Sequence, residues 1–412
     1  MNSAFSSILP ILVSVAFLML GNGALGTLIG IRLSLAGAGP VAVGIVGAAY
    51  FAGLTVGSMQ CFRLISRVGH IRAFAAFASV FSAASLGHAI VADVWLWTAL
   101  RFLEGLCLAG IYMCVESWLN DQASNETRGR ILSLYMVTLY AALGAGQQLL
   151  NLEADPGALL FMVISILVSI SLVPVSLTRT APPMLPDVTS FSLRKLYRAS
   201  PLGLAGVFIS GTMTGALYSL GPVFGATSGF GVSGTAAFMT VLILGGVLLQ
   251  WPLGRLSDIL DRRTVIIAVA AVLGAASLGL WATPAAEQWR FLAFALFFGG
   301  LSFSLYPLSL AHTNDYVAKS DLVAASGGLI LLNSVGAILG PLAGSVAMSL
   351  IGPSGLFVFS AVMALGAAGF GIARTFARPS LPAEAQAAFQ PLPQTTPVAA
   401  PLHPEHEDAP AA

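Results

Sequence analysis

The chain has 412 residues, of which 57% are hydrophobic and only 8% are charged, whereas a water-soluble domain carries about 25% charged residues. Together with a mean hydropathy of +0.88, this composition excludes a soluble fold, whose exterior must face water, and favours an exterior that faces lipid. The net charge of +1 gives no basic field that would attract nucleic acid.

Apolar stretches of about 20 residues predict membrane-spanning helices. The first stretch follows a start, MNSAFSSILP, that lacks the basic residues of a secretory signal, so we expect it to be retained as a helix. The sequence predicts an all-α membrane protein with 12 transmembrane helices. They cover residues 8–31, 40–62, 73–92, 94–119, 131–150, 157–177, 201–226, 232–253, 264–282, 289–311, 322–351 and 355–375.

A polar stretch divides these helices six and six. We expect an N-terminal six-helix bundle over residues 1–178, a cytoplasmic linker over 179–200, a C-terminal six-helix bundle over 201–376 and a disordered cytoplasmic tail over 377–412. The linker contains the basic sequence SFSLRKLYRAS, which suits the inner lipid headgroups. The tail is rich in Ala and Pro and cannot build a core. Its HPEHED sequence is either a solvated end or a metal site, and we expect no metal.

Positive charges predict the orientation of the helices. With the N-terminus inside, the inner segments hold fifteen Lys and Arg residues and the outer loops hold only Arg32 and Arg290. The positive-inside rule therefore predicts that both termini are cytoplasmic. We expect a multi-pass protein of the bacterial inner (plasma) membrane. The inner residues are Arg63, Arg67, Arg72, Arg128, Arg130, Arg179, Arg194, Lys195, Arg198, Arg255, Arg262, Arg263, Lys319, Arg374 and Arg378.

The two halves resemble each other at a shift of 192 to 194 residues. Residues 105–121, GLCLAGIYMCVESWLND, align with residues 299–315, GGLSFSLYPLSLAHTND. This alignment matches Gly105 with Gly299 and Tyr112 with Tyr306. Parallel repeats of this kind are typical of transporters with a central site between two bundles.

Short motifs carry a family resemblance. The loop after the eighth predicted helix reads GRLSDILDRR and resembles the G-x-x-x-D-R-x-G-R-R signature of the major facilitator superfamily. ESWLND, GQQLL and YPLSLA resemble the YcaD-like branch of that superfamily. The resemblance implies the superfamily fold, two pseudo-symmetric six-helix bundles around a central cavity, and transport by alternating access.

The same resemblance implies a latch at the cytoplasmic helix ends, where carboxylate and guanidinium groups pair and separate as the protein opens. Alternatively, these residues are only positive-inside anchors. For Glu116 we expect an ion pair with an inner arginine, namely Arg67, Arg72 or Arg130. The candidate latch residues are Arg67, Gly69, Arg72, Glu116, Gly254, Asp258, Arg262 and Arg263.

Two charges fall inside the fourth predicted helix. Arg101 with Gly105 and Ala109 resembles the superfamily's R-x-x-x-G-x-x-x-[GA] pattern. An intramembrane charge costs about 2.5–3.5 kcal/mol, so Arg101 needs a partner, and Glu104 is available three residues on. We interpret the pair as a proton-coupling or substrate-orienting site. The alternative is that Arg101 extends to the outer surface.

Polar residues near the middle of the predicted helices are the candidates for the cavity wall, because lipid would not satisfy them. An interhelical hydrogen bond would explain any one of them equally well. They are Asn22, Tyr50, Tyr140, Gln147, Gln148, Thr212, Thr214, Tyr218, Ser302, Tyr306 and Asn333.

Function follows as an expectation. We expect a monomeric secondary active transporter of a small-molecule substrate, in contact with membrane lipid and coupled to protons, with no cofactor, no catalytic residue and no nucleic-acid partner. Uptake and efflux stay open. The alternatives are a non-transporting receptor or sensor and a membrane-embedded enzyme. The sequence contains no G-x-x-x-x-G-K-[ST] loop for ATP and neither HExxH nor GxSxG.

Overall fold

The computed structural model describes residues 2–124, 126–153, 157–177, 192–284, 287–318 and 321–376, and also Gln386, Phe389, Thr395 and Thr396. This part of the chain is all-helical, with twelve long α-helices, the short helix α7 and one 3-10 helix, η1. The elements are α1 (Asn2–Leu35), α2 (Pro40–Val68), α3 (His70–Gly87), α4 (Val94–Asp121), α5 (Arg128–Gly146), η1 (Gln147–Leu152), α6 (Ala158–Ser176), α7 (Leu193–Ala199), α8 (Pro201–Thr227), α9 (Gly231–Ile259), α10 (Arg262–Ala282), α11 (Gln288–Asn314), α12 (Leu322–Ile351) and α13 (Gly355–Thr375).

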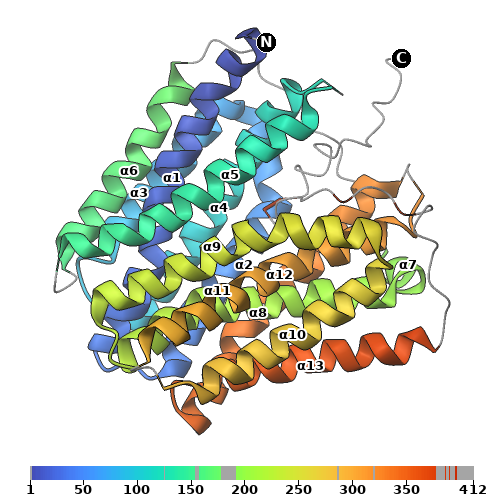
Figure 1. The fold of residues 1–412 in the computed structure, drawn as a ribbon. Helices are drawn as coiled ribbons and strands as arrows, with labels where there is room; N and C mark the ends of the chain where they lie inside the picture. Colours follow the sequence, from blue (N-terminus) through green and yellow to red (C-terminus); the bar gives the residue numbers. More distant parts are fainter. Residues whose placement is uncertain are drawn as a thin grey trace.

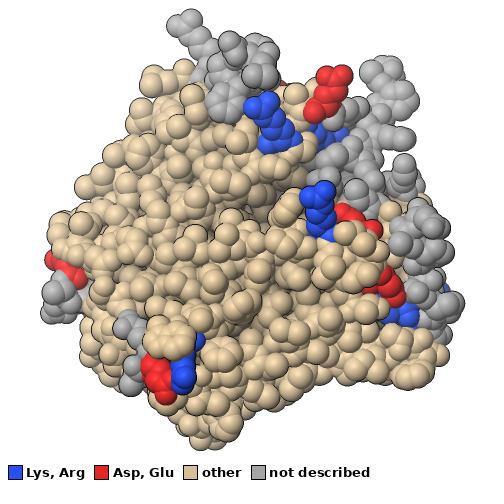
Figure 2. Space-filling view, in the orientation of Figure 1, with Lys and Arg blue, Asp and Glu red and all other residues tan. Residues whose placement is uncertain are grey.

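The twelve long helices occupy the positions of the twelve predicted spans. Ten of those that the structure describes are long and apolar enough to cross a membrane. The other two, α3 and α5, carry arginines in their first turns and have 18 and 19 residues. Figure 2 shows the resulting surface, where charged side chains lie toward the ends of the helices and leave a broad uncharged band between them.

Two helices extend beyond their predicted ends in the same way. The prediction stops α2 at residue 62 and α9 at residue 253, but the helices continue to Val68 and Ile259. The added residues are RLISRV in α2 and GRLSDI in α9, and both stretches contain charged side chains. The apolar stretch therefore ends before the helix does. Gly69 ends α2 at a φ of 84°, a conformation that favours glycine.

The helices form two bundles with the same packing pattern (Figure 1). In the first bundle α2 packs on α4, α1 on α5 and α6, and α3 on α4 and α6; in the second, α9 packs on α11, α8 on α12 and α13, and α10 on α11 and α13. The linker prediction falls partly on residues 178–191, and the tail prediction mostly on residues after 376, which lie outside the described part. Within the linker, α7 buries Leu196 and exposes Tyr197.

Glycines repeat this pattern at the level of single backbone contacts. A Cβ on Gly105 of α4 would overlap the carbonyl oxygen of Tyr50 in α2, and a Cβ on Gly299 of α11 would overlap that of Leu242 in α9. The partner positions keep the 192-to-194 shift (50 to 242, 105 to 299). Small residues let the helix backbones approach this closely.

Three further glycine pairs behave in the same manner, so the internal repeat holds in the packing. Gly23 and Gly215 face the carbonyl oxygens of Leu143 and Ala337, Gly53 and Gly245 face those of Phe102 and Leu296, and Gly146 and Gly340 face those of Leu20 and Thr212. Gly340 belongs to the GAILGPLAG sequence of α12, whose glycines therefore serve close packing against α8.

The two bundles meet at one end of the molecule. We call the end with α7, the last turn of α9 and the first turn of α10 the terminal end, and the other the opposite end. Near the opposite end, Gly44 of α2 approaches the carbonyl oxygen of Pro341, and a Cβ at Gly30 of α1 would lie 2.8 Å from the Cβ of Pro222. Gln148 of η1 donates to Thr240 of α9 over 2.8 Å. These contacts close the space between the bundles at this end.

Candidate functional site

A cavity of about 180 Å³ lies between the bundles. Its wall comes from α1, α2, α4, α5 and η1 of the first bundle and from α8, α11 and α12 of the second, with Thr395 as the one described lining residue from beyond α13. A pocket shared by the two bundles is the place where a solute would contact both.

Seven of the polar residues predicted for the cavity do line it. They are Asn22, Tyr50, Tyr140, Gln147, Thr214, Tyr218 and Asn333. Five further polar residues, which the sequence did not single out as lining residues, complete the wall: Thr27, Tyr112, Ser219, Ser334 and Thr395. Aromatic rings of Phe51 and Phe303 lie beside them.

Two buried amides fix the wall through hydrogen bonds to helix backbones. Gln147 donates through Nε2 to the carbonyl oxygen of Gly23 over 2.7 Å and accepts from the hydroxyl of Thr27 over 2.7 Å. Asn333 donates through Nδ2 to the carbonyl oxygen of Val207 over 3.0 Å. Because these donors and acceptors are already hydrogen-bonded to the helices, the orientation of each amide toward the cavity is fixed without a bound solute.

Four of the predicted residues are not part of this wall. Gln148 is exposed and bonds Thr240 across the bundles. Thr212 is buried against the α12 glycines and donates to the carbonyl oxygen of Phe208. Ser302 and Tyr306 are buried, and their hydroxyls have no partner in the described residues. Helical position alone does not separate an interhelical contact from a cavity contact.

Two charged residues of α4 and a histidine from the end of α3 form a buried cluster. The Nη1 atom of Arg101 lies 3.0 Å from one oxygen of Glu104, and Nε2 of His88 lies 3.1 Å from the other. Glu104 and His88 are fully enclosed, whereas Arg101 reaches the cavity and is 7% exposed. The carboxylate is therefore held between an imidazole and a guanidinium, and only the guanidinium meets the cavity.

Aromatic rings hold both ends of this cluster. The guanidinium carbon of Arg101 lies 3.9 Å from the ring centroid of Tyr50, a cation–π contact. The His88 ring lies 4.9 Å from Trp97 and 5.8 Å from Phe161, between centroids. Sequence spacing predicts the Arg101–Glu104 pair but not His88, which lies in the turn directly after α3. The only signal was a histidine at the end of an apolar stretch.

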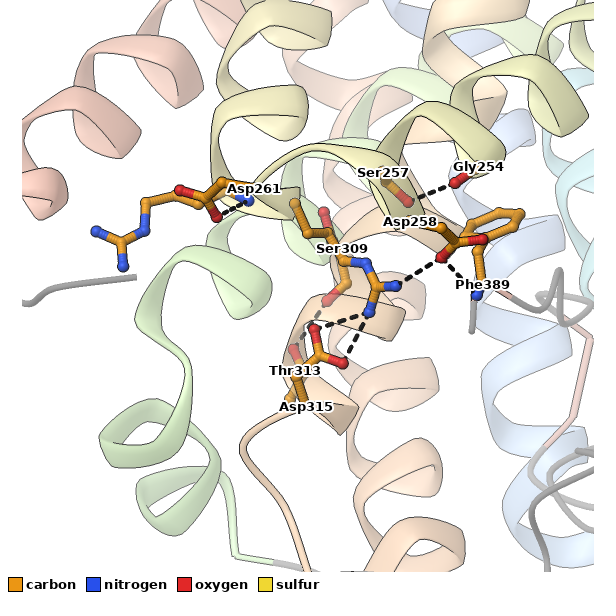
Figure 3. A network of polar contacts seen from close by, with 10 residues as sticks. Gly254, Ser257, Asp258, Asp261, Ser309, Thr313, Asp315 and Phe389 are labelled. Carbon is orange, nitrogen blue, oxygen red and sulfur yellow. Dashed lines mark hydrogen bonds and ion pairs between the residues drawn. The ribbon is translucent and has the colours of Figure 1, made fainter. Parts of the chain in front are cut away.

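A second network lies at the terminal end of the second bundle (Figure 3). Arg262 donates to both oxygens of Asp315, over 2.8 and 2.7 Å, and to Asp258 over 3.0 Å. Arg262 and the Asp315 side chain are each 1% exposed. The structure thus joins two latch candidates, Asp258 and Arg262, and adds Asp315, which the motif did not indicate.

The other latch candidates do not join this ion network. Gly254 lies one turn before Asp258, and Arg263 is buried with its backbone N–H donating to Asp261 over 3.1 Å. In the first bundle, Arg67 and Arg72 are exposed and form no ion pair within the described residues. Gly69 is the turn between α2 and α3.

The expected ion pair of Glu116 with an inner arginine is not formed. Glu116 is fully buried, and it accepts hydrogen bonds from the hydroxyls of Tyr135, Thr395 and Thr396. Arg67, Arg72 and Arg130 are exposed, and burying one of them beside Glu116 would cost the free energy of its desolvation.

Comparison with known proteins agrees with this architecture. The family model of the Major Facilitator Superfamily matches residues 11–249 and 206–403. A Salmonella heidelberg (strain SL476) protein described as "Uncharacterized MFS-type transporter YcaD" is 30% identical over 366 residues, which are 88% of this chain and 94% of that protein. The protein of that description from Escherichia fergusonii is 32% identical over 302 residues, which are 73% of this chain and 78% of that protein.

Solved structures share the fold. The crystal structure of the nucleoside transporter NupG has a TM-score of 0.72 at 14% identity and covers 91% of this chain and 99% of its own. A bacterial homolog of the human lysosomal transporter Spinster, in an inward-facing and occupied conformation, has a TM-score of 0.73 at 15% identity and covers 94% and 99%.

Proposed function

The chain belongs to the major facilitator superfamily and is a multi-pass bacterial membrane transporter, and from this premise we propose that it carries a small solute across the inner membrane by alternating access, coupled to protons. The observation that carries the proposal is the cavity shared by both bundles, with a buried Arg101–Glu104–His88 cluster at its edge. The chain acts as a transporter and not as an enzyme.

The terminal end is the cytoplasmic end in this proposal. The positive-inside distribution of the sequence supports it, because the loops of this end hold almost all of the lysines and arginines. The contacts at Gly30, Gly44 and Gln148 then lie on the outer side. This arrangement has the outer side closed, and transport requires that the bundles rock and separate there.

Coupling would act through Glu104. This carboxylate has two partners, Arg101 on the cavity side and His88 on the other. When Glu104 binds a proton it loses its charge, so Arg101 would be free to bind a solute or water in the cavity. A proton that enters down a membrane potential of 100 mV contributes about 2.3 kcal/mol to the cycle.

The lining supports a solute without net charge. Arg101 is the only lining residue with a formal charge among those described, and Glu104 balances it. Tyrosine and phenylalanine rings, amides and hydroxyls form the remaining polar and aromatic wall. They suit a ring-bearing solute with several hydrogen-bonding groups. Nucleosides have this chemistry, and NupG is named as a nucleoside transporter.

A solute screen followed by flux tests the proposal. Purified protein is heated with nucleosides, amino acids and monosaccharides in turn, because a bound solute raises the unfolding temperature. The solute with the largest shift is then radiolabelled, and its uptake is measured in proteoliposomes with and without a pH gradient. We expect accumulation only with the gradient. Equal flux under both conditions would contradict proton coupling, and the absence of flux for every stabilising solute would contradict transport.

Glu104→Gln is the matching variant. It keeps a hydrogen-bonding side chain of the same size, so we expect the protein to fold and to lose gradient-driven accumulation at least tenfold. Glu287→Gln is the control, because Glu287 forms an exposed ion pair with Arg290 at the same i,i+3 spacing, 2.7 Å apart. Unchanged accumulation by Glu104→Gln would remove Glu104 from coupling.

A further inference from the structure

His88 lies between Glu104 and the loop 88–93, which joins α3 to α4 at the opposite end of the first bundle. This loop reaches the surface, and its Ile90 is 79% exposed. His88 itself is only 1% exposed, and its ring lies 3.1 Å from the Glu104 carboxylate. One side of this residue therefore adjoins a surface loop, and the other side adjoins the buried carboxylate.

Aromatic contacts fix the orientation of the His88 ring. Phe161 of α6 stacks on it with an interplanar angle of 23°, and Trp97 of α4 meets it edge-on at 86°. The Nε1 atom of Trp97 donates to the carbonyl oxygen of Val91 over 2.7 Å, which ties the loop to α4. In this orientation Nε2 is the ring nitrogen that faces Glu104.

The two nitrogens of the His88 ring have different surroundings. Beside an ionised Glu104, Nε2 must carry a proton, because two acceptors would otherwise face each other. Nδ1 of the neutral ring is then an acceptor, and it is buried with no hydrogen-bond partner among the described residues. Nδ1 is bonded to the ring carbon that carries Cβ, so it lies on the side of the backbone and of the loop. A buried acceptor without a protein partner marks a place where a donor such as water binds.

The second bundle shows that packing does not require these polar groups. At the shift of 194 residues, Phe291 and Phe298 take the positions of Trp97 and Glu104. Both phenylalanines are 1% exposed and belong to an apolar cluster of aromatic rings. The contact between imidazole and carboxylate is therefore an addition of the first copy to the shared scaffold.

The titratable and charged groups around the His88 ring come from α4. Glu104 contacts the ring directly, and Arg101 pairs with the other oxygen of Glu104. The helix α6, which supplies the stacked phenylalanine, has no titratable side chain. Those of α3, His70 and Arg72, lie in its first turn at the other end of the helix. Proton exchange at His88 is therefore linked first to the charge of Glu104.

We propose that His88 relays protons between the outer side and Glu104. A proton delivered by water forms a bond with Nδ1, the N–H bond at Nε2 breaks, and the released proton forms the O–H bond of Glu104 across the 3.1 Å contact. The ring is neutral before and after this step, and exchange of its proton with water restores the first tautomer. The relay rests on the proposed function, to which it adds a route for the coupling proton: His88 serves Glu104 from the outer side, while Arg101 faces the cavity.

A rapid pH jump followed by infrared absorption tests the relay without any solute. The purified full-length chain is mixed from alkaline to acidic pH, and the C=O band of protonated Glu104 is identified as the band that Glu104→Gln lacks. We expect His88→Gln to slow the rise of this band at least tenfold and to leave its final height unchanged. The Gln amide replaces the Nε2 donor to Glu104 but cannot accept a proton on one side and release one on the other. The control is His70→Gln, which changes another buried histidine that packs on Trp118.

Three results overturn the relay: equal rates in the native chain and His88→Gln, equal slowing by His70→Gln, or no Glu104 band in the native chain. Flux of the solute found in the screen then tests the consequence. We expect His88→Gln to lose gradient-driven accumulation at least tenfold and to keep the exchange of labelled for unlabelled solute, which needs no net proton movement. A band that depends on His88, together with equal flux with and without a pH gradient, would contradict proton coupling and leave the relay intact. The two failures are therefore distinguishable.

Discussion

The two bundles repeat each other in packing but not in chemistry. At the shift that pairs Gly105 with Gly299, Arg101 and Glu104 of α4 correspond to Ala295 and Phe298 of α11. The charged cluster of the first bundle is thus replaced by an apolar one. Phe298 packs on Phe357 with centroids 5.9 Å apart. Its cluster consists of Phe224, Phe230, Phe238, Phe291, Phe298 and Phe357.

At the terminal end the chemistry is reversed. The second bundle holds Arg262 between Asp258 and Asp315. At the corresponding place the first bundle has His70, whose ring packs on Trp118 with centroids 5.7 Å apart. One scaffold therefore carries the Arg101–Glu104–His88 cluster, for which we propose coupling, in its first copy and the Arg262 network in its second. In each case the corresponding residues of the other copy serve packing.

The largest expected effect on stability comes from removing the carboxylate of the charged Arg101–Glu104–His88 cluster. Glu104→Ala leaves Arg101 and His88 without the carboxylate between them, and we expect it to lower the free energy of unfolding by about 3–5 kcal/mol. Arg101→Ala/Glu104→Ala should cost less than Glu104→Ala alone, because no unpaired charge remains. Thermal unfolding in detergent measures both. A double variant that is less stable than the single would show that packing, not charge, holds this core.

The matching change in the second bundle is Phe298→Ala. It removes a buried ring from the aromatic cluster and should cost about 3 kcal/mol. Here the double variant Phe298→Ala/Phe357→Ala should be less stable than either single variant, which is the reverse of the order expected for the charged cluster of the first bundle. Unfolding curves of the three variants measure the difference. If the double variant were the more stable one, the contrast between the bundles would be lost.

The next largest expected change in stability comes from the Arg262 network, the proposed latch of the second bundle. Asp315→Asn weakens two hydrogen bonds to the buried Arg262, and bonds to charged groups contribute about 1.5–3 kcal/mol, so we expect a loss of about 2 kcal/mol. Asp121→Asn is the matched control, because Asp121 occupies the corresponding place in the first bundle and, among the described residues, its side chain accepts a hydrogen bond only from Gln122, over 3.0 Å. Equal losses would mean that the latch is not confined to the second bundle.

The contact between bundles gives a smaller, conformational effect. A Cβ at Gly47 would overlap the side chain of Ser219, so Gly47→Ala should separate the bundles at the opposite end. We expect a shift of about 1–2 kcal/mol toward the state that is open there, seen as faster labelling of Ser219→Cys by an impermeant maleimide. Gly26→Ala is the control, because a Cβ at Gly26 meets nothing within 4 Å. An unchanged labelling rate would contradict the closure.

The smallest effect compares two tyrosines that the repeat pairs. The Tyr306 hydroxyl is buried without a partner among the described residues, so Tyr306→Phe should change stability by less than about 0.5 kcal/mol. Its counterpart Tyr112 lines the cavity and bonds the sulfur of Met19 over 3.3 Å. Tyr112→Phe should weaken binding of the screened solute. Equal effects on binding would place both tyrosines in the same role.

The sequence predicts the helices well because lipid demands long apolar stretches. It misjudges ends such as those of α2 and α9, where a helix continues into water with polar residues. It also predicts a 131–150 span that the structure divides into α5 and η1.

Within the site, the sequence predicts what spacing along one helix can show. Arg101 and Glu104 are three residues apart on α4, so their pairing follows from the helix period. His88, Asp315 and Thr396 meet their partners through tertiary packing, which no local pattern encodes. Thr212 and Tyr306 show the converse, since a polar residue in mid-helix can face a neighbour instead of the cavity.

The paired glycines determine where the chain tolerates substitution. Each member of a pair such as Gly53 and Gly245 faces a backbone oxygen of its own bundle, so no larger residue fits in either copy. In a saturation mutagenesis experiment, intolerant glycines should therefore occur as twins in the two halves, whereas intolerant ionic residues such as Glu104 should occur singly. Positions that tolerate no substitution in both halves would mark the scaffold that the halves share. Positions that tolerate none in one half only would mark residues that serve transport.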